Sequence, residues 1–323
     1  MKVLLPLGML YGGLGALRVM AYRAGWLRSH RVEGPVISVG NLSVGGSGKT
    51  PVVEWIARTL RDASLPVAIL SRGYGGAYAG GPQVVSDGES VRMDSGQAGD
   101  EPVMLARSLP GVPVLVGRRR DEAAALAERR FGRRVHVLDD GFQHLRLRRD
   151  LDLVCATPDD LRDWPLPAGR LREFPGAVRR AHAVLLAGDG RMDGVETWSV
   201  TRRVLGFRDL EGGEAALPSR AWLVSGIARP ERFVEDARAC GIEVAGRDAF
   251  RDHHRFSDAD WERVAARARA ERVEAILTTA KDAVRLPPAA ASGPPVRVLS
   301  VAVEFAEAER FRERILAVAR RAA

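Results

Sequence analysis

A glycine-rich segment near the start of the chain has the residues of a phosphate-binding loop. It reads Ser43-Val44-Gly45-Gly46-Ser47-Gly48-Lys49-Thr50. A short apolar run at residues 36–39 precedes it, and apolar residues recur at helical spacing after Pro51, so the order is strand, loop, helix. That order directs free backbone N–H groups and the positive end of a helix toward a phosphate. We therefore predict that these eight residues bind a nucleotide.

The lysine of this loop is unusual for the chain, which has only three lysines (Lys2, Lys49 and Lys281) among its 49 basic residues. A compact ammonium can reach the β and γ phosphates from inside a tight turn, whereas a planar guanidinium suits bidentate partners. One departure from the usual motif is Ser43, which stands where the first glycine is expected. The alternative, a glycine-rich turn that binds nothing, is disfavoured by the flanking strand and helix patterns.

Two adjacent carboxylates, Asp139 and Asp140, end the apolar run at residues 135–138. In enzymes with a phosphate-binding loop, a carboxylate in this place helps to hold Mg²⁺ beside the loop hydroxyl, which here is Thr50. Gln143 and His144 follow within reach of the same metal and phosphates. A solvated turn is the alternative, and the presence of the loop makes it the weaker one.

Two other clusters could supply or orient a general base. Asp100 and Glu101, before Pro102, could accept a proton from an acceptor hydroxyl or could cap a helix, and spacing alone leaves both open. Asp252-His253-His254 holds the only adjacent pair among six histidines. No third ligand lies at metal-binding spacing, so zinc is disfavoured, and a histidine that orients a carboxylate is the other possible role.

The composition is that of a globular protein with an anionic partner. The 323 residues are 46% hydrophobic and 28% charged, with a net charge of +8 and a pI near 10.2. Nucleic acid, an acidic membrane and a phosphorylated substrate would all suit this charge. Zinc-finger spacing, aromatic RNA-binding signatures and a lysine-rich tail are absent, which argues against nucleic acid. The two separated cysteines, Cys155 and Cys240, give no disulfide framework and fit a reducing, cytoplasmic compartment.

The N-terminus carries an uncharged stretch from Val3 to Leu17, flanked by Lys2 and by four arginines, Arg18, Arg23, Arg28 and Arg31. It is shorter than the roughly 20 residues that span a bilayer, and no convincing signal-peptide cleavage site follows. We expect an interfacial helix whose arginines face anionic headgroups, with a buried N-terminal helix as the alternative.

The remaining pattern predicts an α/β fold. Candidate strands of a parallel sheet lie at 67–70, 112–116, 135–138, 151–156 and 183–186, with a helical segment at 119–130. A more polar stretch at 196–211 could be β strands that link two domains. A second α/β unit follows, with strands at 222–225, 275–279 and 296–301, helices at 230–239 and 257–269, and a terminal helix. The expected organisation is a membrane-interface region at 1–30, a kinase domain with the phosphate-binding loop at 31–200, and a β linker with a smaller α/β domain at 201–323.

Several motifs occur together in one order along nearly the whole chain. They are Val39-Gly40-Asn41-Leu42-Ser43 running into the loop to Pro51, Ser71-Arg72-Gly73-Tyr74-Gly75, Gly99-Asp100-Glu101-Pro102, Leu138-Asp139-Asp140-Gly141-Phe142-Gln143-His144, Pro167-Ala168-Gly169-Arg170-Leu171-Arg172-Glu173 and Asp252-His253-His254. This ordered set resembles the tetraacyldisaccharide 4'-kinase family, the lipid A 4'-kinases. The family has serine or threonine at the Ser43 position, so the missing glycine is a family feature.

The resemblance implies an enzyme at the cytoplasmic face of the bacterial inner membrane, peripherally bound, that uses ATP and Mg²⁺. It would move the γ-phosphoryl group to the 4'-hydroxyl of a tetraacylated glucosamine disaccharide 1-phosphate in lipid A biosynthesis. An anionic membrane surface would be its partner, with no nucleic acid and no evident obligate protein partner. A membrane-associated ATPase or GTPase switch with a phosphate-binding loop is the rival function, and a non-catalytic adaptor is a second.

The resemblance also implies roles for residues at matching positions. Asp100 would be the general base and His253 its partner in a dyad, with Lys49 and Asp139 also catalytic. A second set would organise Mg²⁺, namely Thr50, Asp139, Asp140 and Gln143. A third set would line the substrate side of the cleft, namely Arg120, Arg172 and Glu173. A loop around Lys281 could close over the nucleotide or could be an ordinary surface loop.

Overall fold

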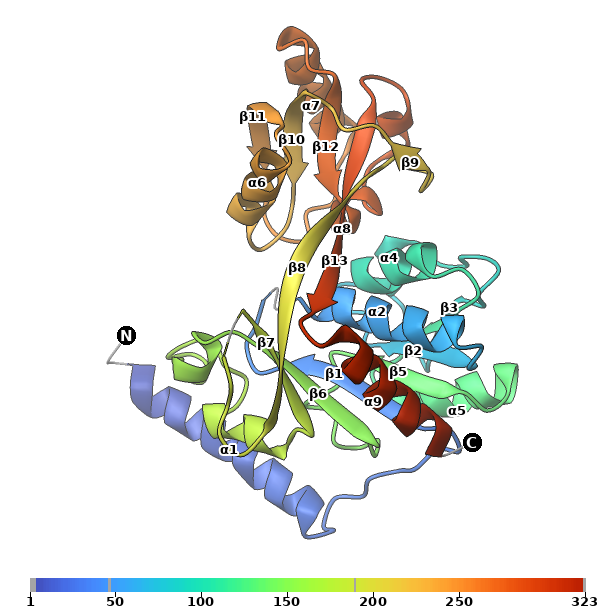
Figure 1. Ribbon diagram of the computed structural model, residues 1–323, viewed down its shortest axis with the longest axis vertical. Helices are drawn as coiled ribbons and strands as arrows, with labels where there is room; N and C mark the ends of the chain where they lie inside the picture. The colour runs from blue at the N-terminus through green and yellow to red at the C-terminus, as the bar shows by residue number, and fades with distance from the viewer. Residues whose placement is uncertain (1–3, 46–47, 189, 322–323) are drawn as a thin grey trace.

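The computed structural model describes residues 4–45, 48–188 and 190–321, which form two lobes that share one sheet (Figure 1). Its helices are α1 (Leu5–Arg23), α2 (Lys49–Asp62), α3 (Ser95–Ala98), α4 (Asp100–Ser108), α5 (Arg120–Phe131), α6 (Pro230–Ala239), α7 (Asp258–Ala270), α8 (Ala280–Ala283) and α9 (Ala308–Arg321). Its strands are β1 (Val36–Asn41), β2 (Val67–Ser71), β3 (Gln83–Ser86), β4 (Val114–Val116), β5 (Val135–Asp139), β6 (Leu151–Ala156), β7 (Ala183–Ala187), β8 (Glu196–Arg208), β9 (Glu214–Ala215), β10 (Arg220–Ser225), β11 (Glu243–Ala249), β12 (Ala275–Thr279) and β13 (Val296–Phe305). Short 3₁₀ turns lie at Asp160–Arg162, Pro175–Arg180 and Pro288–Ala291.

The larger lobe is built on parallel strands in the order β7-β6-β1-β5-β2-β4, with β3 added antiparallel at the edge. Every residue of β1, β2, β5 and β6 is buried. Such continuous burial is typical of a parallel sheet covered by helices on both faces. Because parallel strands end at the same edge, the loops after β1 and β5 come together, which positions the phosphate-binding loop beside the two carboxylates.

A long antiparallel ribbon of β8 and β13 joins the lobes and confirms the expected β linker (Figure 1). Its register runs from Arg208 opposite Val298 to Val200 opposite Phe305. The other edge of β8 pairs parallel with β7, and that of β13 pairs parallel with β12. The two lobes are therefore parts of a single sheet, and the ribbon of β8 and β13 connects them.

The smaller lobe continues this sheet in the order β13-β12-β10-β11, with all its pairs parallel. Phe233 on α6 and Trp261 on α7 are buried against it. The last helix, α9, returns to the larger lobe, where Phe311 stacks on Phe305 with ring centroids 4.2 Å apart and lies 5.4 Å from Trp55 of α2. The division into residues 1–30, 31–200 and 201–323 stays a prediction, and its boundary at 200 falls within β8.

Most of the strands expected from apolar runs are present, and the exceptions have a physical reason. β13 extends to Phe305, beyond the expected end at 301, because its second half pairs with β8. β3 and β11 were not predicted. β11 is a polar edge strand without a fully buried residue, and β3 has four residues, so neither gives an apolar run.

Helix α1 lies along the outside of the larger lobe (Figure 1). Its buried side consists of Gly8 and Gly12, where an added Cβ would come within 2.8 Å of Ala168 and 2.7 Å of Phe174. Its other side exposes large apolar residues, namely Leu7, Met9, Leu10, Leu14, Leu17 and Met20, each at least 53% exposed. Among the described residues, no helix combines the length and apolar character needed to cross a membrane. A helix buried throughout, the alternative for this stretch, does not fit these exposures.

Candidate functional site

The phosphate-binding loop leaves β1 and enters α2, which begins at Lys49. Gly45 and Gly48 have φ angles of 110° and 76°, a region that side chains other than glycine adopt at a cost. Gly46 and Ser47, which complete the expected loop, lie outside the described residues. Ser43 is buried, Val44 is exposed, and Thr50 is half-buried in the first turn of α2. The first backbone N–H groups of α2 thus face the loop, as phosphate binding requires.

The Lys49 ammonium is held by two groups from neighbouring strands. It donates to Asn41 Oδ1 at 2.9 Å and lies 3.2 Å from Asp140 Oδ1. Asn41 in turn donates to the Ser43 carbonyl at 2.6 Å, so the end of β1 and the loop are tied together. The Lys49 ammonium is therefore held beside the end of β1 and the carboxylate of Asp140.

Asp139 and Asp140 have opposite environments although they are adjacent. Asp139 is 1% exposed, and its Oδ2 accepts a 3.2 Å hydrogen bond from the Ser71 hydroxyl, while its Oδ1 has no partner among the described residues. Burial raises the pKa of Asp139 to about 7, with further contributions from Glu101 and Asp140. Asp139 is thus a buried acid with one free oxygen.

For Asp140, burial also opposes ionisation, but Lys49 and Arg172 outweigh it and hold the pKa below its ordinary value. Arg172 Nη1 donates to both carboxylate oxygens, at 2.9 and 2.8 Å. Asp140 has a φ of 55°, which turns the chain sharply at the end of β5. Asp140 is therefore an ionised carboxylate fixed between two cations.

This part of the site fits Mg²⁺. The unpartnered Oδ1 of Asp139 is buried, and a buried carboxylate oxygen without a hydrogen bond is costly unless a cation or water meets it. Mg²⁺ usually takes one or two carboxylates together with substrate phosphates and water, and does not need an all-protein cage. That agrees with the described residues, among which no group of three acidic, histidine or cysteine side chains is arranged for a metal.

Gln143 lies at the same edge of the sheet, and its side chain is hydrogen-bonded to neighbouring residues. Its Nε2 donates to the Asn41 carbonyl at 3.0 Å and its Oε1 accepts from Arg172 at 3.3 Å. Its backbone carbonyl accepts a 3.0 Å hydrogen bond from Arg18 of α1. Gln143 therefore links the N-terminal helix to the phosphate-binding edge of the sheet.

The three residues expected on the substrate side are placed differently from one another. Arg172 faces the main cleft, whereas Arg120 is buried behind Asp140 and donates to its backbone carbonyl at 3.3 Å. Burial lowers the pKa of Arg120, with Asp140 and Asp139 acting in the opposite direction, and its Nε has no hydrogen-bond partner within the described part of the chain. Glu173 borders the cleft, and Arg180 holds it through hydrogen bonds of 2.6 and 2.7 Å.

Asp100 and His253 meet across the two lobes. His253 Nδ1 lies 2.8 Å from Asp100 Oδ2, and Arg285 Nε lies 3.3 Å from the same oxygen. The alternative that Asp100 caps a helix does not hold, because α4 begins at Asp100, its N-cap is Gly99, and no side chain caps it. Asp100 is instead a buried carboxylate that is held by Arg285 and by His253, and His253 lines the main cleft.

The two adjacent histidines have separate partners. His253, whose φ is 61°, faces Asp100, while His254 Nε2 lies 3.1 Å from Asp260 and its ring stacks on Phe250 at 4.5 Å. They therefore do not act as a metal-binding pair. Tyr74 packs edge-on to His253 with ring centroids 5.5 Å apart.

Residues of both lobes and of α1 border one cleft of about 1290 Å³ between the lobes. The larger lobe contributes Lys49, Thr50, Asp140 and Arg172, the smaller lobe contributes His253 and Lys281, and α1 contributes Tyr11, Leu14 and Arg18. The polar residues around the phosphate-binding loop and the apolar residues of α1 thus line the same cavity. A substrate with a charged head and apolar chains would match both ends.

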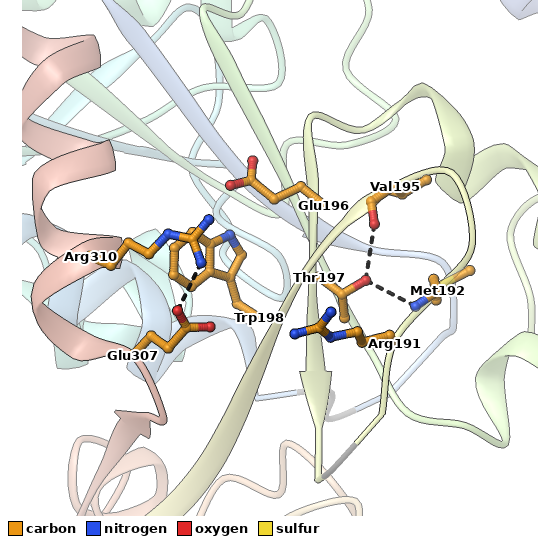
Figure 2. A pocket seen from close by; sticks show the side chains of 8 residues that line it. All are labelled: Arg191, Met192, Val195, Glu196, Thr197, Trp198, Glu307 and Arg310. Atoms are coloured by element: carbon orange, nitrogen blue, oxygen red, sulfur yellow. Dashed lines mark hydrogen bonds and ion pairs between the residues drawn. The ribbon is translucent and has the colours of Figure 1, made fainter.

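A second cavity of about 310 Å³ lies where β8 begins beside α9 (Figure 2). Its charged groups are largely paired, since Arg310 lies 2.8 Å from Glu307 and above the ring of Trp198. It contains neither the phosphate-binding loop nor the Asp100–His253 pair. The larger cleft is therefore the candidate site.

Comparison with known proteins agrees with this geometry. A family model described as tetraacyldisaccharide-1-P 4'-kinase matches residues 1–320. The chain belongs to the tetraacyldisaccharide 4'-kinase family. Relatives with that name include proteins of Koribacter versatilis, 36% identical with 98% of each chain covered, and of Azoarcus sp., 41% identical with 97% of this chain and 91% of the relative covered.

A solved structure extends the family resemblance to the fold. LpxK from Aquifex aeolicus, described as an "apo" form in complex with ATP, has a TM-score of 0.84 and 31% identity, with 98% of this chain and 99% of that chain covered. The α/β fold with its phosphate-binding loop and the family expected from the ordered motifs are both confirmed.

Sequence reasoning did not single out three residues that support the site. Asn41 contacts Lys49 and Ser71 contacts Asp139, and each ends a strand within one of the ordered motifs, which was the available signal. Arg285 contacts Asp100 from a segment 185 residues away and gave no local signal among so many arginines. Lys281, suggested as part of a closing loop, lies 3.2 Å from His253 Nε2.

Proposed function

We propose that this chain transfers the γ-phosphoryl group of ATP to the 4'-hydroxyl of a tetraacylated glucosamine disaccharide 1-phosphate, a step of lipid A biosynthesis. Its main support is that, in a chain whose family membership covers residues 1–320, the phosphate-binding loop borders the same cleft as His253, the member of the Asp100–His253 pair that lines it. The loop would hold the donor, and the pair would meet the acceptor.

The donor half of the site is the proposed task of the larger lobe, within residues 31–200. Backbone N–H groups of the loop and the Lys49 ammonium would bind the β and γ phosphates. Asp139, Asp140 and Thr50, with Gln143 beside them, would hold Mg²⁺, which when bound neutralises phosphate charge. Asp140 already pairs with Lys49 and Arg172, so the nucleotide would enter a site whose charges are arranged in advance.

The acceptor half would depend on Asp100. Its carboxylate would accept the proton of the 4'-hydroxyl as that oxygen bonds to the γ phosphorus and the bond from phosphorus to the β,γ-bridging oxygen breaks, releasing ADP. After the transfer, the proton of the hydroxyl would be bound to the Asp100 carboxyl group. His253 Nδ1 lies 2.8 Å from Asp100 Oδ2, and His253 would orient the carboxylate for this transfer.

The cations around the cleft suit an anionic, phosphorylated acceptor. Arg172 faces the cleft, and Arg18 lies at the end of the cleft nearest α1. We assign Arg172 to contact transferred or substrate phosphate, Arg120 to fix the Asp140 loop from behind, and Glu173 to anchor the cleft wall through Arg180. The net charge of +8 would add long-range attraction for the same substrate.

We further propose that α1 lies in the membrane interface at the cytoplasmic face of the inner membrane, with residues 1–30 as the docking region. Its exposed leucines would enter the acyl boundary, and Arg18, Arg23, Arg28 and Arg31 would meet anionic headgroups. Because Tyr11 and Leu14 of this helix border the cleft, a lipid substrate could reach the site without leaving the membrane surface.

Turnover with and without the lipid acceptor tests this function against a nucleotide-driven switch. ADP formation is followed in detergent micelles with ATP and Mg²⁺, with and without the disaccharide 1-phosphate. A kinase shows ADP formation that depends on the acceptor and equals the amount of newly phosphorylated lipid. ADP formation at the same rate without acceptor, and no phosphorylated lipid, would favour the switch.

A further inference from the structure

Lys281 occupies a special position next to the Asp100–His253 pair. Its Nζ lies 3.2 Å from His253 Nε2, 3.5 Å from Asp252 and 3.8 Å from Glu101. It belongs to α8, at the end of β12 in the smaller lobe, and only 22% of its side chain is exposed. The distances place the ammonium on the side of the imidazole ring that faces away from Asp100.

The proton inventory of these groups favours one of the two tautomers of a neutral His253. An ammonium has only donors, so a hydrogen bond between Lys281 and Nε2 requires a bare, accepting Nε2. The ring proton then lies on Nδ1 and is donated to Asp100 Oδ2. If the proton were on Nε2, it would point at the Lys281 ammonium, and Nδ1 would face the Asp100 carboxylate with a lone pair against a lone pair.

The surroundings hold both partners in place. The Gly226 carbonyl accepts hydrogen bonds from the His253 backbone and from Arg285, each at 3.0 Å. Arg285 also pairs with Asp282, which stabilises the turn of α8 that carries Lys281. Lys281 and His253 thus stand on one rigid corner of the smaller lobe.

The two carboxylate oxygens of Asp100 have different surroundings. His253 and Arg285 both contact Oδ2, and Oδ1 has no partner among the described residues. A fixed Nδ1–H keeps Oδ2 occupied and leaves Oδ1 as the oxygen available to accept the proton of an acceptor hydroxyl. We propose that Lys281 is a positioning residue that sets the Nδ1–H tautomer of His253 and thereby orients Asp100 as the base. This inference rests on the proposed kinase function.

The test measures the tautomer directly in the full-length protein labelled with ¹⁵N-histidine, with His253 assigned by its loss in His253→Asn. We expect a pyrrole-type Nδ1 and a pyridine-type Nε2 in the wild type. In Lys281→Met, which keeps the aliphatic stem without the donor, the two signals should move toward each other or exchange. Lys281→Arg, again with donors only, should retain the wild-type pattern.

Kinetics supply the second measurement. Lys281→Met should lower kcat about ten-fold or more, leave the KM for ATP unchanged, and be partly rescued by Lys281→Arg. The matched control is Arg247→Met, which removes an exposed cation of the same lobe that lies 3.9 Å from Glu231, outside the cleft, and should leave kcat unchanged.

Three results would overturn the proposal. They are a pyrrole-type Nε2 in the wild type, an identical pattern in Lys281→Met, or a raised KM for ATP with normal kcat, which would assign Lys281 to the nucleotide. Absence of kinase activity in the wild type would refute the proposed function, while the spectra would still report on the tautomer.

Discussion

His253 Nδ1 lies 2.8 Å from Asp100 Oδ2 although 153 residues separate them in the chain. Asp100 starts α4 of the larger lobe, and His253 stands on a turn of the smaller lobe with a φ of 61°. The pair therefore exists only when both lobes are folded and joined through the β8 and β13 ribbon.

Replacing the carboxylate of Asp100 should separate chemistry from nucleotide binding. Asp100→Asn keeps the shape but cannot accept the proton, so kcat should fall about 10²- to 10⁴-fold with ATP affinity nearly unchanged. Steady-state kinetics and ATP titration measure the two quantities. Loss of ATP affinity with normal kcat would move Asp100 to the donor half of the site.

Asp139 should make the stability of the metal-free protein depend on pH. Its pKa is raised from 3.8 to about 7 by burial, so the folded state holds a proton that the unfolded state has lost between these pH values. The free energy of unfolding should therefore decrease as the pH rises from about 4 to about 7, by at most about 4 kcal/mol.

Asp139→Asn should remove this pH-dependent loss while it abolishes Mg²⁺-dependent activity. Urea unfolding with a chelator present, at several pH values, compares the variant with the wild type. Ser86→Ala, at a buried polar residue of β3 outside the cleft, serves as the control and should keep the wild-type pH slope. Equal slopes in Asp139→Asn and wild type would assign the pH dependence to other groups.

The exposed leucines of α1 should determine membrane binding. Leu7, Leu10 and Leu17 are 53%, 61% and 58% exposed and lie outside the cleft lining. Changing all three to serine should reduce partition into anionic vesicles about ten-fold or more, since each buried apolar side chain contributes about 1.5–3 kcal/mol. Leu205→Ser, at a residue 64% exposed on the β8 ribbon, should have no effect. Equal losses in both variants would argue against α1 as the docking surface.

Two neighbouring glycines of α1 should respond oppositely to alanine. At Gly12 an added Cβ would come within 2.7 Å of the Phe174 ring, whereas at Gly13 nothing lies within 4 Å. Gly13→Ala should raise the free energy of unfolding by up to about 1 kcal/mol through helix propensity. Gly12→Ala should lower it by about 1–3 kcal/mol through overpacking, measured by thermal or urea unfolding. Equal shifts would show that α1 is not packed closely at Gly12.

The sequence predicted the elements and residues that a local pattern defines. The loop to Lys49, the carboxylates after β5 and the polar strands of the linker each follow from spacing within a few residues. Contacts between the two lobes have no such local signal. Spacing alone therefore could not decide whether Asp100 is a general base or a helix cap, and it did not point to Arg285. The pairing of Asp100 with His253 was predicted from the family resemblance of the ordered motifs and not from the spacing of the two residues.

The burial of individual site residues was also beyond the sequence. Arg120, Arg172 and Glu173 were expected as one set, yet Arg120 is buried behind Asp140 while Arg172 faces the cleft. Nothing in an arginine's neighbours along the chain distinguishes the two environments. The fold does so, because it places Arg120, at the start of α5, against the backbone carbonyl of Asp140.

The position of the new phosphate on the lipid distinguishes a 4'-kinase from every rival function. Purified protein is incubated with ATP, Mg²⁺ and tetraacyldisaccharide 1-phosphate, and the product is examined by ³¹P NMR and mass spectrometry. We expect a second phosphate monoester at the 4' carbon, formed in proportion to ADP and absent with Lys49→Met. A product that carries only the original 1-phosphate, or one phosphorylated at another hydroxyl, would contradict the proposed function.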